Sequence, residues 1–331
     1  MKTRDTEYLY ATSRVRALER TLLTKDRLAR MLEAPSFDDL LKVIAEFGYA
    51  TDAQSPAGLD KALGDEREAS FSLVASLVPD KNLVDVFRVK YDYHNIKAIL
   101  KGDARGVSPD ALLINAGTIA ASALRTHMRQ MDYRDMAPIM RAAVEQAREI
   151  LNRTSDPQLM DFVLDHAYFA QLIQMAKLSD VAFLKSYVRL LIDVSNLRAL
   201  VRGMRRGVSA EFLRSALIDG GSVDTSRLLA ATTAEATLNE MFAGTPLEWA
   251  ADAGSLAISG EAGFTRFERL CDNALMKLMH SARYTAFGAP PLVAYLAAKE
   301  ADIMAIRIVS AGKISELPTD EVRERLRDTY V

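Results

Sequence analysis

Apolar residues recur every three or four positions along almost the whole chain. An early example is the series Leu28, Leu32, Leu40, Leu41 and Ile44. This spacing places the residues on one face of an α-helix, whereas a half-buried strand needs strict alternation of apolar and polar residues. Alternating runs of Val, Ile, Thr and aromatic residues are hard to find. The pattern therefore predicts an all-α protein without a sheet.

Residues that favour helix N-termini recur between the apolar segments. Ser36, Ser209 and Thr319 each precede one or two acidic residues, and Ser108 precedes a proline. A hydroxyl at the N-cap accepts a backbone hydrogen bond, and acidic residues or proline suit the first turn. We therefore expect a helix to begin after each of these four residues. Residues 219–262, with clusters of Gly, Ser and Thr, are expected to hold a long connection.

One motif occurs three times along the chain. The segment DYHNIKAILKGDARGVSPDAL begins at Asp92, and DVSNLRALVRGMRRGVSAEFL begins at Asp193 and aligns with it without a gap. A weaker third copy, DIMAIRIVSAGKISELPTDEV, begins at Asp302. Amphipathic segments that run into an aromatic residue precede the copies, at residues 36–49, 156–169 and 267–284. The chain therefore reads as three helical repeats, with predicted boundaries 1–113, 114–215 and 216–331.

These repeats have the size of small domains, roughly 100 residues each. They are too long for the common two-helix solenoids, whose repeats have roughly 33 to 47 residues. Similar units with similar faces tend to close around an axis. We therefore predict a pseudo-threefold arrangement around a shared central surface or hole.

The helix that carries the motif is predicted to be packed on two sides. Over residues 86–102, one apolar stripe contains Val89, Tyr93, Ile96 and Leu100, and a second lies nearly opposite. Polar residues beside such stripes are expected to bind donors on an adjacent helix or its N-terminus, and the glycine that follows is expected to end the helix. The predicted structural joints are Asp92, Asn95 and Gly102 in the first copy, Asp193, Asn196 and Gly203 in the second, and Asp302 and Gly312 in the third, where Ala305 replaces the asparagine.

Composition narrows the class of protein. The 331 residues are 49% apolar and 26% charged, a balance typical of folded proteins with a large core. A formal net charge of -2 provides no basic field, so a nucleic-acid binder is the weakest alternative. The first residues lack the features of a secretory signal, and no apolar run has the roughly 18 residues that a membrane helix needs. Any membrane role is therefore expected to be peripheral.

The sequence lacks the motifs of common catalytic and cofactor sites. It contains no G-x-x-x-x-G-K-[ST] nucleotide loop, no G-x-S-x-G elbow and no histidine pair at metal-ligand spacing. The single cysteine, Cys271, excludes an internal disulfide and is interpreted as a small core residue, and Trp249 as a packing anchor. We therefore predict no catalytic, metal or cofactor site. An enzyme that uses carboxylates such as Asp92 and Asp193 stays open as an alternative.

Four segments together resemble a known family. YLYATSRVRALERTLL, FRVKYDYHNIKAILKG, LIDVSNLRALVRG and PLVAYLAAKEADIMAIRIVSAGK are similar, in this order, to the C subunit of the rotary V-type and A-type ATPases, which eukaryotes call the d subunit. The resemblance runs from Tyr8 to Tyr330. It implies a funnel-shaped, non-catalytic adapter on the cytoplasmic face of the membrane. That adapter links the central-stalk shaft to the proteolipid ring and needs no cofactor, small-molecule substrate or nucleic acid.

Basic residues occupy related places near the ends of the three motif copies. They are candidates for binding an acidic partner surface, although ordinary solvated side chains are an equally good interpretation. The alternative to the rotary adapter is a helical scaffold protein outside the ATPase. The partner-binding candidates are Lys101, Arg105, Arg202, Arg205, Arg206 and Lys313.

Overall fold

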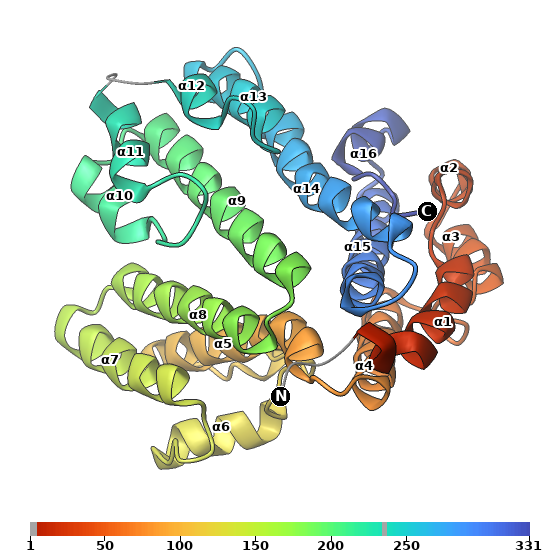
Figure 1. Cartoon of the computed structure of the whole chain (residues 1–331), viewed down its shortest axis with the longest axis horizontal. Coiled ribbons are helices and arrows are strands. Elements are labelled where there is room, and N and C mark those ends of the chain that lie inside the picture. Colours follow the sequence, from red (N-terminus) through yellow and green to blue (C-terminus); the bar gives the residue numbers. More distant parts are fainter. Residues whose placement is uncertain (1–4, 234–236) are drawn as a thin grey trace. The chain divides into compact units, whose positions relative to one another are not determined.

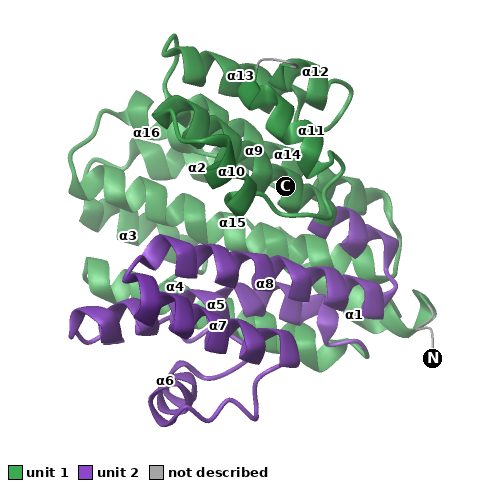
Figure 2. Ribbon diagram, turned by 90° about the vertical axis from the view of Figure 1, so that its left-hand side faces the viewer, with its two compact units in different colours: residues 1–79, 189–331 green, residues 80–188 purple. Residues whose placement is uncertain are grey.

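The computed structural model in Figure 1 describes residues 5–233 and 237–331. These residues form helices joined by turns and contain no strand, so the all-α prediction is confirmed. The chain divides into two compact units, which Figure 2 colours separately. The central unit is residues 80–188, and the terminal unit combines residues 1–79 with residues 189–331.

The central unit contains a helical hairpin with a third long helix against it. Helices α7 and α8 pack along each other, and α8 also packs against α5 (Figure 1). The first residues of α9 belong to this unit as well. The elements are α5 (Asn82–Arg105), η3 (Asp110–Leu112), α6 (Ala121–Gln130), α7 (Pro138–Thr154), α8 (Pro157–Ser179) and α9 (Ala182–Arg206).

The terminal unit is built from both ends of the chain. Its N-terminal elements are η1 (Asp5–Tyr8), α1 (Leu9–Leu18), η2 (Glu19–Thr21), α2 (Lys25–Glu33), α3 (Phe37–Glu46) and α4 (Pro56–Leu77). Most of α9 follows. The remaining elements are α10 (Ala210–Ala216), α11 (Thr225–Leu229), η4 (Ala230–Thr233), α12 (Leu238–Phe242), α13 (Glu248–Ser259), α14 (Phe264–Ser281), η5 (Ala282–Tyr284), α15 (Ala289–Ile314) and α16 (Thr319–Arg325).

Two hydrophobic clusters form the core of the terminal unit. One joins α9 to the helices from α10 to α14. The other joins residues 23–63 to residues 303–326, so that α2, α3 and α4 share a core with α15 and α16. Leu40, Ile44 and Ile306 are fully buried there, and burying each such side chain contributes roughly 1.5–3 kcal/mol. The two ends of the chain are therefore held together by apolar packing.

The predicted helix starts are correct at two of the four positions. Ser36 and Ser209 cap α3 and α10, and each hydroxyl accepts a backbone N–H three residues further on, at 3.1 and 3.2 Å. The prediction at Ser108 is wrong, because only the 3₁₀ turn η3 follows it. The prediction at Thr319 is also wrong in detail. Thr319 is the first residue of α16, and Pro318 occupies the N-cap.

Two further predictions about the third repeat were wrong. Residues 219–262 do not form a long irregular connection, because α11, η4, α12 and α13 lie within them; residues 234–236 are outside the described part of the chain. Trp249 is not a packing anchor, since 70% of its surface on α13 is exposed. Cys271, by contrast, is buried in the core as predicted, and burial raises the pKa of its thiol to about 12.

Candidate functional site

In the first motif copy, a buried carboxylate holds the loop that follows α5. Asp92 Oδ2 accepts hydrogen bonds from the Thr118 backbone N–H at 2.9 Å and from Thr118 Oγ1 at 2.6 Å, and Oδ1 accepts the Ile119 N–H at 3.1 Å. The loop passes so close that a Cβ atom on Gly117 would lie 2.0 Å from Oδ1. Burial raises the pKa of Asp92, and these hydrogen bonds oppose the shift.

The asparagine of the motif makes a two-way contact with the same loop. Asn95 Nδ2 donates to the Ile114 carbonyl, and the Ile114 N–H donates to Asn95 Oδ1, both at 2.8 Å. A carboxamide both donates and accepts, so it can satisfy both backbone groups of one residue, whereas a carboxylate can only accept. This geometry explains why asparagine stands at this position.

The second motif copy repeats these contacts. Asp193 accepts the backbone N–H and the Oγ hydroxyl of Ser222, at 2.7 and 2.6 Å. Asn196 exchanges two hydrogen bonds of 2.8 Å with the backbone of Ile218. A Cβ atom on Gly221 would lie 2.3 Å from Asp193 Oδ1. The two copies therefore share a construction and not only a sequence.

The third joint takes its partners from the other end of the chain. Asp302 is buried on α15, and its Oδ2 accepts the Leu23 N–H at 3.0 Å and the Tyr49 hydroxyl at 2.7 Å. Ala305 provides no carboxamide. Burial raises the pKa of Asp302 to about 7 and outweighs the opposing effects of these two hydrogen bonds and of the Lys299 and Arg27 charges. The third joint thus ties the last long helix to the N-terminal segment.

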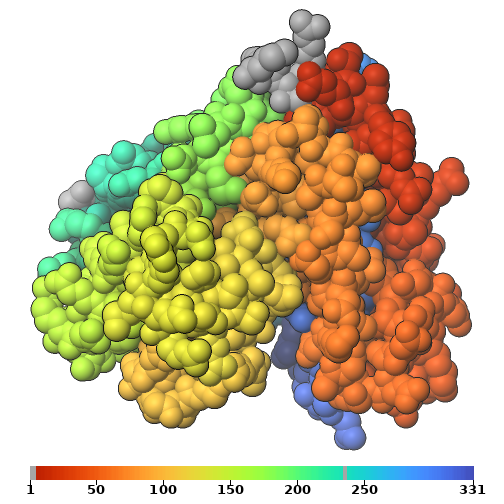
Figure 3. Space-filling view, turned by 90° about the horizontal axis from the view of Figure 1, so that it is seen from below, coloured from red at the N-terminus to blue at the C-terminus, as the bar shows by residue number. Residues whose placement is uncertain are grey.

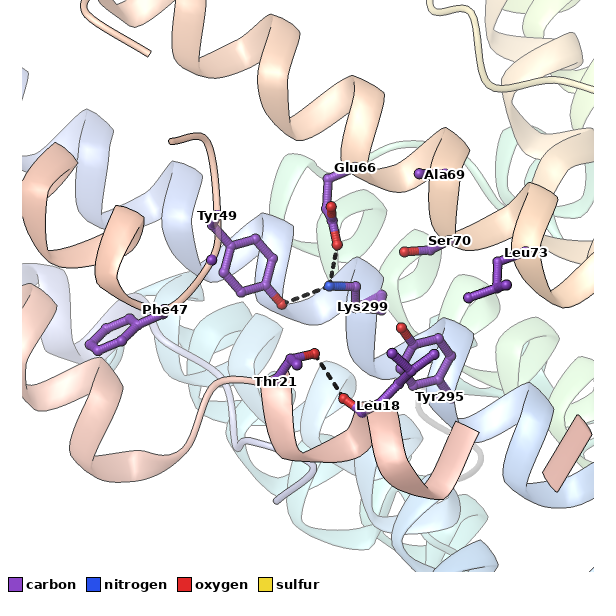
Figure 4. A pocket seen from close by; sticks show the side chains of 11 residues that line it. Leu18, Thr21, Phe47, Tyr49, Glu66, Ala69, Ser70, Leu73, Tyr295 and Lys299 are labelled. Carbon is purple, nitrogen blue, oxygen red and sulfur yellow. Dashed lines mark hydrogen bonds and ion pairs between the residues drawn. The ribbon is translucent and has the colours of Figure 1, made fainter. Parts of the chain in front are cut away.

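A pocket of about 260 Å³ lies beside the third joint (Figure 4). Lys299 is buried on its wall, with Nζ 2.5 Å from Glu66 Oε1 and 3.1 Å from the Tyr49 hydroxyl. The hydroxyl in turn donates to Asp302, so the four side chains form one polar network. The pocket is lined by Leu18, Thr21, Phe47, Gly48, Tyr49, Glu66, Ala69, Ser70, Leu73, Tyr295 and Lys299.

The glycines predicted to end the motif helices have a different role. α5 and α9 continue past Gly102 and Gly203 to Gly106 and Gly207, which have φ values of +66° and +67°. Glycine favours this left-handed region because it has no Cβ atom. Gly102, Gly203 and Gly312 are instead points of close packing. A Cβ atom there would lie 2.9, 2.5 and 2.4 Å from the segment that follows each helix.

This crowding gives a test with a matched control. Gly312→Ala is expected to destabilise the protein by about 1–3 kcal/mol, because the new methyl group must displace Val322 of α16. Gly64 lies inside α4, where a Cβ atom would have no neighbouring atom within 4 Å, so Gly64→Ala is expected to stabilise by about 0.5–1 kcal/mol. Urea unfolding of both variants measures the two changes. Similar values for both would contradict the packing role of Gly312.

In the central unit, two ion pairs join the motif helix α5 to α8, which contains the amphipathic segment that precedes the second motif copy. Lys97 Nζ lies 2.6 Å from Asp165, and Lys101 Nζ lies 2.6 Å from Asp161. The basic residues are four apart on α5, and their acidic partners are four apart on α8 in the reverse order. The two helices therefore run antiparallel here. Lys101, a candidate for partner binding, therefore has an acidic partner within its own chain.

The same arrangement joins α9 to α14 in the terminal unit. Arg198 lies 2.8 Å from Asp272, and Arg202 lies 2.5 Å from Glu268. The two acidic residues are again four apart, like the pair on α8. The amphipathic helices before the second and third copies are thus the ones that pair with the preceding motif helix.

The remaining candidates divide into anchored and unanchored side chains. Arg205 donates to the Ile258 carbonyl at 3.1 Å, and Lys313 donates to the Leu32 carbonyl at 2.7 Å. The two candidates that are exposed and form no hydrogen bond or ion pair with the described residues are Arg105 and Arg206. Among all the candidates, these two side chains are the most available to a partner.

Joints of this kind, repeated along an all-helical chain, define the class of protein: a helical repeat protein whose buried polar groups tie neighbouring segments together. Residues 11–325 match the model of the ATP synthase (C/AC39) subunit family, and the chain belongs to that family. The resemblance seen in the four sequence segments is thereby confirmed at family level. Within residues 5–233 and 237–331, no helix is both long and apolar enough to cross a membrane.

Similar proteins match this chain over most of its length. The C subunit of the V-type sodium ATPase of Enterococcus hirae is 23% identical, and the match covers 98% of this chain and 99% of the relative. The C subunit of the V-type ATP synthase of Thermus thermophilus is 24% identical, with 97% and 98% covered. The C subunit of the A-type ATP synthase of Methanocaldococcus jannaschii is 24% identical, with 96% and 86% covered.

Proposed function

We propose that the chain is the non-catalytic central-stalk adapter of a V-type or A-type ATPase. In this role it links the rotating shaft to the membrane proteolipid ring and couples rotation to ion transport. The observation that carries the proposal is the family match over residues 11–325, together with relatives of similar length that are named as C subunits. The proposed partners are the shaft subunits and the proteolipid ring, without nucleic acid, cofactor or small-molecule substrate.

The adapter would be a peripheral protein on the cytoplasmic face of the membrane. We propose that its repeats, residues 1–113, 114–215 and 216–331, form a pseudo-threefold funnel. A rotor part must transmit torque without deforming. Three buried carboxylates, one in each repeat of the motif, hold segments of the chain to long helices. Buried polar groups that are hydrogen-bonded to neighbouring segments make a body more rigid, which supports this mechanical role.

Affinity capture of the tagged full-length protein from gently solubilised native membranes tests the proposal. We expect ATPase shaft subunits and proteolipid to be recovered with it, identified by mass spectrometry. If those subunits are present in the membranes and the protein is recovered alone, the adapter role is wrong. The alternative of a helical scaffold outside the rotary ATPase would then be favoured.

The two unanchored arginines provide a sharper test of partner binding. We expect the double variant Arg105→Glu, Arg206→Glu to recover roughly tenfold less of the ATPase partners, with a weaker dependence on salt, because charge reversal removes attraction to an acidic surface. Arg129→Glu, a reversal at an exposed position at the end of α6, is the control. Unchanged recovery and unchanged salt dependence in the double variant would contradict a role for these two residues.

A further inference from the structure

The pocket beside the third joint is large enough for a small molecule. Its volume is about 260 Å³, whereas a cavity of roughly 150 Å³ already holds a benzene ring. Two of its lining positions, Gly48 and Ala69, carry no large side chain. A Cβ atom on Gly48 would have no neighbouring atom within 4 Å. The pocket therefore has room for one ring with a polar substituent.

The pocket is open to solvent on the side of the N-terminal segment. Thr21, Gly48 and Ala69 line it and are exposed, whereas Lys299 on α15 is buried. Figure 3 shows the N-terminal segment (red) and the segment that follows it (orange) at the molecular surface. A molecule from solution therefore enters past these two segments, and Lys299 lies on the inner wall.

Two ionised side chains on the wall have hydrogen-bonding capacity left. An ammonium group has three N–H donors, and those of Lys299 have two partners among the described residues, Glu66 Oε1 at 2.5 Å and the Tyr49 hydroxyl at 3.1 Å. Glu66 Oε2 has no donor among those residues. Figure 4 shows the side chains of Lys299 and Glu66 pointing toward each other. One donor and one acceptor are thus left next to each other.

The charges at this end of the pocket are already paired. Glu66 neutralises Lys299, whose ammonium also lies 4.4 Å from the centre of the Tyr49 ring. The neighbouring Arg67 and Glu300 form an ion pair of 2.6 Å. A charged ligand would lose its hydration without gaining an unpaired counter-charge, which is costly. A neutral head group with one donor and one acceptor loses less and suits both remaining groups.

The other end of the pocket is apolar. Leu18, Phe47, Leu73 and the ring of Tyr295 line it. Apolar walls with a few placed polar groups are typical of small-molecule sites. The apolar body of a ligand would pack against these side chains while its head group meets Lys299 and Glu66.

We infer that this pocket binds a neutral small molecule with an amide or hydroxyl head group on an apolar body of about one ring. The oxygen of the head group would accept the third N–H of Lys299, and its N–H or O–H would donate to Glu66 Oε2. The walls belong to α1, α4 and α15, so a bound molecule would hold the N-terminal segment to α15, as the third joint does. The molecule would be a ligand and not a substrate, and its binding does not depend on the adapter role.

Ring compounds of similar size and different charge test the class of ligand. Benzamide or benzyl alcohol at about 10 mM is expected to raise the Tm of the full-length protein by about 2 °C, as a Kd of about 1 mM would do. Benzoate and benzylammonium are expected to bind at least about tenfold more weakly in calorimetric titrations. Equal affinity for the charged compounds would contradict a neutral ligand. If neither neutral compound binds at this concentration, the inference is wrong.

Two leucine variants on α4 test the place of binding. Ala69→Leu extends a side chain into the pocket and is expected to weaken benzamide binding at least about tenfold. Ser76→Leu adds the same side chain at an exposed position on α4 that does not line the pocket, and it is expected to leave the affinity unchanged. Wild-type affinity in Ala69→Leu would mean that benzamide binds elsewhere.

Photolabelling with 4-azidobenzamide locates the site in the wild type, without any variant. The labelled peptides are expected to contain residues 18–21, 47–49, 66–73 or 295–299, and an excess of benzamide is expected to suppress the labelling. Labelling confined to other parts of the chain, or labelling that benzamide does not suppress, would overturn the assignment of this pocket.

Discussion

Asp92→Asn is expected to lower the free energy of unfolding by about 3 kcal/mol, although the two side chains have nearly the same shape. Both carboxylate oxygens of Asp92 accept hydrogen bonds: Oδ2 from the N–H and hydroxyl of Thr118, and Oδ1 from the N–H of Ile119. An asparagine keeps one acceptor and turns its NH₂ group toward a backbone donor. At least one buried N–H then loses its partner. Denaturant unfolding at about pH 7.5 measures the loss.

Asp302→Asn is the matched control, because its donors are arranged differently. Both the Leu23 N–H and the Tyr49 hydroxyl bind the same oxygen, Oδ2. The amide oxygen of an asparagine can take that place and accept both. We therefore expect no loss of stability from this variant under the same conditions. A loss of stability as large as that of Asp92→Asn would show that the arrangement of hydrogen-bond donors does not determine how much an Asp→Asn substitution destabilises the protein.

The repeated helices and part of their pairing could be predicted from the sequence, because both depend on local periodicity. The all-α class followed from the spacing of apolar residues. The amphipathic segment that precedes each motif copy could also be recognised in the sequence. Acidic residues four apart, Asp161 with Asp165 and Glu268 with Asp272, match the basic residues of the motif. Spacing of this kind on two helices signals an antiparallel ion-pair ladder. It would have shown that Lys101 and Arg202 have intramolecular partners.

Other features depend on contacts that no local pattern encodes. The first two motif copies have two glycines near the end of the helix, and the third copy has one. Glycine is favoured both at a helix C-cap and at a point of close packing, so the sequence alone does not distinguish the two roles. Only the course of the following segment shows that Gly106 ends α5 while Gly102 makes room for the chain. The third joint joins Tyr49 to Asp302, which are far apart in sequence. The exposure of Trp249 likewise depends on which face of α13 the rest of the unit covers.

The third joint should also make stability depend on pH, with an unusual sign. The pKa of Asp302 is about 7 in the folded protein, whereas an aspartate in an unfolded chain has a pKa of about 3.9. Between these values the folded state binds more protons than the unfolded state, so stability falls as pH rises. Below the lower value both states are protonated, and above the higher value both are ionised, so the contribution is constant outside this window.

As the pH rises from about 5 to about 7.5, ionisation of Asp302 is expected to lower the free energy of unfolding of the wild type by about 2–3 kcal/mol. The free energy of unfolding of Asp302→Asn is expected not to show this decrease. The other buried acids, such as Asp92, are present in both proteins, so their titration cancels in the difference. Lys299 and Arg27 face Asp302 and favour its ionised form, but burial outweighs them. Parallel stability profiles for the two proteins across this range would mean that Asp302 titrates like an exposed aspartate. The polar network that binds α15 to the N-terminal segment would then remain charged throughout.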